Sequence, residues 1–80
     1  MYDWILYLYN NEEKMELLTR GKVYGGRDAW GAARDFLKKE MQEGSLLLGD
    51  SIKFLIDGNV HFVGTIGDFT KASASRRIGW

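Results

Sequence analysis

Apolar residues at the start of the chain follow the pattern of β-strands. Apart from Asp3, residues 2–9 are all aromatic, β-branched or Leu, a composition typical of a pleated surface and not of an amphipathic helix. The polar residues 10–13 predict a reversal, so residues 14–24 form the second arm of a hairpin. Gly21 interrupts the alternation of this arm, and we expect a bulge or a break there.

Helical spacing follows the glycine pair 25–26. Asp28 is the expected N-cap, and the helix should end near Glu43, with Gly44 as a left-handed terminator. The apolar stripe of this segment predicts the face that meets the core. It contains Ala29, Trp30, Ala33, Phe36, Leu37 and Met41.

A second hairpin is predicted around Asp57-Gly58-Asn59. Apolar residues alternate with polar ones over residues 52–56, and a second alternation follows over residues 60–64. A three-residue loop would place Ile56 opposite Val60 and Phe54 opposite Phe62, which keeps the apolar side chains on one face.

These elements predict an α+β fold with the order β-β-α-β-β. We expect one two-layer domain over residues 1–68, a four-stranded antiparallel sheet with one helix packed on one face. Its expected core contains Trp30, Ala33, Phe36, Leu37, Phe54, Ile56 and Phe62. Residues 69–80 are expected to form a loosely held basic C-terminal tail, with Ser73, Ala74 and Ser75 as a flexible tether.

Composition limits the class of protein. Eighty residues suffice for one core, and the longest apolar run, residues 4–9, is far below the roughly 20 residues of a membrane helix. Asp3 stands where a signal peptide would carry cations, so we expect a cytoplasmic protein without membrane contact. The chain has no Cys and a formal net charge of zero, which excludes thiolate chemistry and argues against broad phosphate neutralisation.

No arrangement of residues predicts catalysis. The single His61 alternates with Val60 and Phe62, so its side chain is expected to face solvent. No Ser or Asp is spaced so as to supply the nucleophile and the orienting partner that a general base requires. The turn from Gly25 to Asp28 lacks the Gly-Lys-Ser ending of a phosphate-binding loop. We therefore expect no enzyme, no metal site and no cofactor.

Aromatic and basic residues are the candidates for binding a partner. Only one face of the first strand can meet the helix, so Tyr7 and Tyr9, with Tyr24 and Leu18, are left for a partner or are half covered by the tail. Arg27 is an exposed cation in a loop. All eleven acidic residues precede residue 69, and the tail carries three cations and ends in Trp, residue types common in interface hot spots. These tail candidates are Lys71, Arg76, Arg77 and Trp80; alternatively, Ile78 or Trp80 folds back onto the core.

The helix sequence DAWGAARDFL at residues 28–37 and the strand-turn sequence IKFLIDGNV at residues 52–60 complete a layout that resembles small phage- and mobile-element-encoded proteins. Among these it is similar to anti-CRISPR proteins, in element order, size and turn placement over residues 2–66. The resemblance implies a stoichiometric inhibitor that occupies a surface of a host CRISPR effector or of another protein–nucleic-acid complex. The absence of net negative charge argues against DNA mimicry.

Two further expectations concern partners. A small nucleic-acid-binding domain is the alternative function, with Tyr7, Tyr9 and Arg27 acting together with the basic tail. An uncovered sheet face or an unprotected edge strand also predicts weak self-association, most simply as a homodimer.

Overall fold

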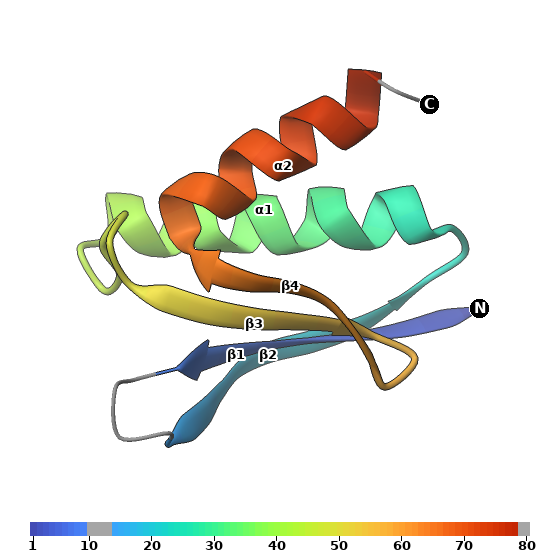
Figure 1. Cartoon of the computed structure of the whole chain (residues 1–80), viewed down its shortest axis with the longest axis horizontal. Helices are drawn as coiled ribbons and strands as arrows, with labels where there is room; N and C mark the ends of the chain where they lie inside the picture. Colours follow the sequence, from blue (N-terminus) through green and yellow to red (C-terminus); the bar gives the residue numbers. More distant parts are fainter. Residues whose placement is uncertain (10–13, 79–80) are drawn as a thin grey trace.

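A four-stranded sheet and two helices form two layers in the computed structural model of the chain (Figure 1). The structure describes residues 1–9 and 14–78, and for residues 74–78 it describes the backbone alone. The elements are β1 (Tyr2–Tyr9), β2 (Met15–Val23), α1 (Gly26–Gln42), β3 (Ser51–Ile56), β4 (Asn59–Thr65) and α2 (Ile66–Ile78). The sheet is antiparallel with strand order β2-β1-β3-β4, and both helices lie on the same side of it. The predicted α+β class and four-stranded antiparallel sheet are confirmed.

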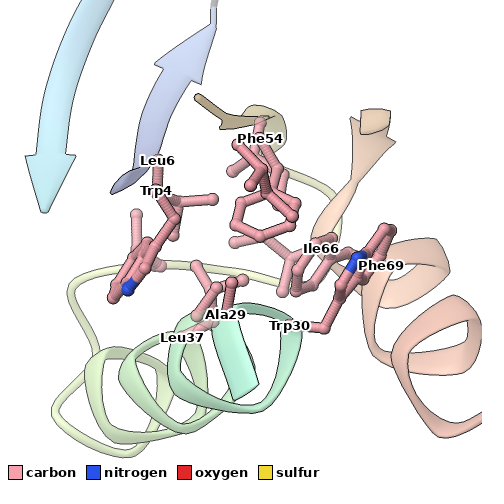
Figure 2. Close-up of a cluster of buried hydrophobic side chains, with 12 residues drawn as sticks. Trp4, Leu6, Ala29, Trp30, Leu37, Phe54, Ile66 and Phe69 are labelled. Carbon is pink, nitrogen blue, oxygen red and sulfur yellow. The ribbon is translucent and has the colours of Figure 1, made fainter. Parts of the chain in front are cut away.

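The helix side of the sheet holds the core. Alternation along β1 and β3 turns Trp4, Leu6, Ile52, Phe54 and Ile56 toward the helices, and all five are buried. Of the seven residues predicted for the core, five are buried. Phe36 and Phe62 are partly buried and pack against the others. Figure 2 shows Trp4 and Leu6 on β1 facing Ala29 and Leu37 on α1, with Phe54 above Trp30.

The N-cap of helix α1 lies three residues earlier than expected. It is Gly25, whose carbonyl oxygen accepts a hydrogen bond from the backbone N–H of Asp28 at 3.1 Å. Asp28 therefore lies in the first turn, where its carboxylate favours the positive end of the helix dipole. The predicted terminator is confirmed: Gly44 has φ +82° and donates to the Met41 carbonyl at 3.1 Å, while Ser45 donates to Glu40 at 2.9 Å.

The segment after residue 68 is helical, so the prediction of a loosely held tail is wrong for the described residues. Phe69 and Ser73 in α2 are fully buried, and Ser73 lies inside the helix and not in a flexible tether. The sequence carried a signal that was missed: Thr65 is followed by Asp68, and the Thr65 hydroxyl oxygen accepts a hydrogen bond from the Asp68 backbone N–H at 3.2 Å. This is the N-terminal half of a capping box.

The second hairpin turns over two residues and not three. Asp57 and Gly58 have φ of 50° and 80°, the left-handed conformations of a type I′ turn, whose twist matches that of the flanking strands. Ile56 therefore pairs with Asn59 and not with Val60. The register then shifts at a bulge between Phe54 and Leu55, so that Phe54 still pairs with Phe62 as predicted.

The first hairpin also contains a bulge, but not at Gly21. The register shifts between Leu6 and Tyr7 of β1, which leaves Leu18 as the extra residue of β2, and Leu18 packs against the core. Gly21 is regularly paired with Trp4, and a Cβ atom there would lie 2.8 Å from the Trp4 Nε1 atom. Gly21 is thus needed for close packing of the indole ring. The predicted reversal at residues 10–13 lies outside the described residues.

Candidate binding surface on the open face of the sheet

The sheet side opposite the helices carries a regular array of side chains from all four strands. Cross-strand partners share a face of a sheet, so the pairing of the strands places three rows there. In the order β2-β1-β3-β4 the rows are Arg20, Ile5, Leu55 and Val60; Leu17, Tyr7, Lys53 and Val63; and Met15, Tyr9, Ser51 and Thr65. Lys22 and Asp3 pair beyond the first row. We call these fourteen residues the open face.

Most of the open face is apolar. Eight of the twelve positions in the three rows are aliphatic or aromatic. The outer strands contribute the most accessible of these side chains, with Leu17 51% exposed on β2 and Val63 56% exposed on β4. A contiguous apolar surface on a small domain marks an interaction site more often than scattered apolar residues do.

The charges of the open face are mainly positive. Arg20 and Lys22 lie on the edge strand β2, and Lys53 lies on the inner strand β3. The acid among the fourteen residues is Asp3, whose carboxylate oxygen Oδ1 lies 3.8 Å from the Lys22 Nζ atom. The face therefore offers a partner an apolar surface with a surplus of cations.

Two of the eight residues predicted for partner binding lie on the open face. Tyr7 and Tyr9 occupy its second and third rows, on the side away from the helices as expected. Leu18, expected to accompany them, packs on the core because of the bulge, and Leu17 takes its place on the open face. β3 and β4 also contribute to this face, and the sequence contained a signal for it: alternation directs Lys53 and Leu55 away from the core.

The other six predicted residues lie elsewhere. Tyr24, 83% exposed, lies in the connection from β2 to α1. Arg27 is exposed, but it lies in the first turn of α1 and not in a loop as expected. Lys71 is exposed on α2, on the helix side of the sheet (Figure 1). Residues 76–78 belong to α2, which lies on the helix side of the sheet, and Trp80 lies outside the described residues. Among the described side chains, the fold therefore brings Tyr7 and Tyr9 together and leaves Tyr24, Arg27 and Lys71 away from the open face.

The described residues contain neither a candidate metal site nor a membrane-spanning helix. His61 is exposed on β4, and within residues 1–9 and 14–78 no three His, Asp or Glu side chains are grouped so that they could hold a metal ion. No helix in this part of the chain has the length and apolar character needed to span a bilayer. Protein-family models, curated protein sequences and solved structures contain no match to the chain.

Proposed function

We propose that this chain is a binding protein that acts without catalysis and that docks on a protein partner through the open face. The observation that carries the proposal is the row of Leu17, Tyr7, Lys53 and Val63, which crosses all four strands on the side that no described helix covers. Burial of apolar surface is the main driving force of protein association. The surplus of cations favours a partner whose apolar surface carries acidic groups.

The dimensions of the open face suit such a contact. Strands about 4.8 Å apart and residues rising about 3.4 Å give a four-strand face roughly 14 Å by 20 Å. This plan area of about 280 Å² approaches that of the largest contiguous patch on a typical monomer, about 300–600 Å², which is often functional. The tyrosines add contact area with little loss of conformational entropy, because each has two side-chain torsions.

The narrower form of the proposal names the partner. The order of the elements from β1 to β4 resembles that of anti-CRISPR proteins, which supports an inhibitor in the cytoplasm of a bacterial host. There it would occupy a surface of a CRISPR effector or of another protein–nucleic-acid complex. Stoichiometric occupation of a surface needs a binding patch, such as the open face, and no catalytic group.

A paired set of variants tests the docking surface. Leu17→Glu places a charge within the open face, whereas Leu47→Glu places the same charge on a leucine that is 68% exposed in the α1–β3 connection, outside this face. The proteins are used to capture partners from bacterial lysate, and each captured protein is then purified and titrated. A specific partner should bind the wild type and Leu47→Glu equally and Leu17→Glu at least about tenfold more weakly. Equal binding to all three proteins would contradict the proposal.

The narrower form has its own test. Purified CRISPR effector complexes are assayed for target binding and cleavage with increasing amounts of the chain, and inhibition should saturate at a fixed molar ratio. Unaffected effectors, together with a captured partner of another kind, would contradict the narrower form and leave the docking surface in place.

One observation favours nucleic acid as a second candidate. Lys53 lies directly opposite Tyr7 on the open face, and aromatic rings beside cations can stack bases and neutralise phosphates. Labelled single-stranded DNA and RNA titrated at several salt concentrations distinguish the two functions. A steep salt dependence that is lost in Tyr7→Ala and Lys53→Met would favour nucleic acid over a protein partner.

A further inference from the structure

Lys53 stands among uncharged side chains near the middle of the open face. Tyr7 of β1 and Val63 of β4 are its partners in the neighbouring strands, and Leu55 and Ser51 lie next to it along its own strand on the same face. These neighbouring side chains leave Lys53 partly buried. It differs in this respect from Arg20 and Lys22, which are exposed on the edge strand β2.

No acid of the described residues occupies a position of the open face next to Lys53. The carboxylate of the face, Asp3, is four residues from Tyr7 along β1, about 14 Å at 3.4 Å per residue, and is already paired with Lys22. A partner that covers the face therefore removes water from the Lys53 ammonium group, and no acid of the described residues of the face is placed to pair with it. Burial of an unpaired charge is strongly unfavourable.

We propose that the partner surface is an apolar protein patch with an Asp or Glu carboxylate at its centre, and that this carboxylate pairs with Lys53. The inference rests on the proposed function and specifies its partner. A carboxylate at this point forms a charge-assisted hydrogen bond with Lys53, while the apolar side chains around it meet apolar groups of the partner. Lys53 thus determines which apolar surfaces are accepted, because a surface without an anion leaves the ammonium group unpaired.

The arrangement of charges disfavours two other occupants. A second copy of the chain, related by a two-fold axis through the open face, would bring a second set of Arg20 and Lys53 against the first. Among the described residues of the face, the acid that it would supply is Asp3, which is already paired with Lys22. A nucleic acid would receive few cations, and the neighbours Val63 and Leu55 are aliphatic and provide neither stacking nor hydrogen bonds.

A random peptide library displayed on phage tests this inference without knowledge of the natural partner. The library is selected on the immobilised wild-type protein and depleted on Leu17→Glu, so that the retained peptides require the open face. The retained peptides should be enriched in Asp or Glu flanked by apolar residues. Individual peptides are then synthesised and titrated by isothermal calorimetry.

Substitutions of Lys53 give the decisive comparison. Lys53→Met preserves the length and the apolar stem and should weaken peptide binding about tenfold, whereas Lys38→Met on α1 should leave it unchanged. Lys53→Glu, used as a new bait, should select peptides enriched in Lys or Arg. Melting curves and circular dichroism of each variant show whether it folds like the wild type.

The outcomes separate this inference from the proposed function. Open-face peptides without acidic enrichment, or with equal affinity for Lys53→Met, would overturn the role of Lys53 and leave the docking surface in place. A selection that yields no peptide dependent on the open face would overturn both. Single-stranded oligonucleotides that bind wild type more tightly than the best peptides, and that lose binding in Lys53→Met, would identify phosphate as the anion and overturn the protein partner.

Discussion

The indole ring of Trp30 stacks on the phenyl ring of Phe69, with ring centroids 5.1 Å apart and ring planes inclined by 10°. Phe54 of β3 meets both rings edge-on, at centroid distances of 5.0 Å and 5.3 Å. This contact joins α1, α2 and the sheet in a single aromatic core (Figure 2). The stacking of Phe69 on Trp30 therefore holds α2 against α1 and the sheet.

Phe69→Ala should destabilise the fold strongly. The Phe69 side chain is fully buried, and its loss leaves a cavity beside Trp30, with an expected decrease in unfolding free energy of about 3–5 kcal/mol. Urea denaturation followed by tryptophan fluorescence measures the decrease. Lys71→Ala, an exposed position of the same helix, should change the free energy by less than about 0.5 kcal/mol. Equal stability of the two variants would contradict the packing of α2 described here.

Gly21→Ala should destabilise the fold, whereas Gly31→Ala should stabilise it. The added methyl group at Gly21 meets the Trp4 ring at 2.8 Å, whereas at Gly31 in α1 nothing lies within 4 Å. We expect a loss of about 1–3 kcal/mol from the clash and a gain of about 0.5–1 kcal/mol from the better helix former. Thermal melting of both variants provides the comparison. In a Trp4→Leu background, Gly21→Ala should cause only a small further loss of stability, because the indole ring is no longer there to clash.

Asp57 joins the second hairpin to β1. Its carboxylate oxygen Oδ1 accepts a hydrogen bond from the Asp3 backbone N–H at 2.8 Å, and its own N–H donates to the Asp3 carbonyl at 2.7 Å. Asp57→Ala loses the side-chain acceptor and places Ala at positive φ, so stability should decrease by about 1–2 kcal/mol. Asp57→Asn retains an acceptor, tolerates this conformation and should stay close to wild type in urea denaturation. A larger loss in Asp57→Asn than in Asp57→Ala would refute this role of the side chain.

Self-association through the open face should strengthen as salt is added. Cations of two copies would face each other, and screening reduces their repulsion. Sedimentation velocity at low and high salt measures the effect, and Lys53→Met should associate more tightly than wild type at low salt. Association that weakens with added salt in the wild type would point to a contact elsewhere, such as an edge strand.

The chain pattern alone was sufficient for most of the architecture. The composition of residues 2–9 and the period-two alternation of residues 52–56 predicted strands, and the helical stripe around Trp30 predicted the face of α1 that is buried. Gly44 indicated the end of α1. These features are local, because the side-chain direction follows from the backbone period and the turn from residues that tolerate positive φ.

The sequence predicted only part of the open face. Alternation placed Tyr7 and Tyr9 on the side away from α1, but it could not show that Leu17 and not Leu18 joins them. That choice depends on the bulge opposite Leu6 and Tyr7, and a shift of one residue exchanges the two faces of a strand. Lys53 acquires its apolar surroundings only when β1 and β4 pair on either side of β3.

The sequence by itself determined the α+β class, the two hairpins, α1 and the absence of thiol chemistry, because these depend on composition and on periods of a few residues. The tertiary structure decided the strand order, the two bulges, the packing of Gly21 against Trp4 and the formation of α2. A helix as short as α2 is marginal in water on its own, and the packing of Phe69 on Trp30 stabilises it. Such contacts join residues far apart in the chain, so no local pattern specifies them.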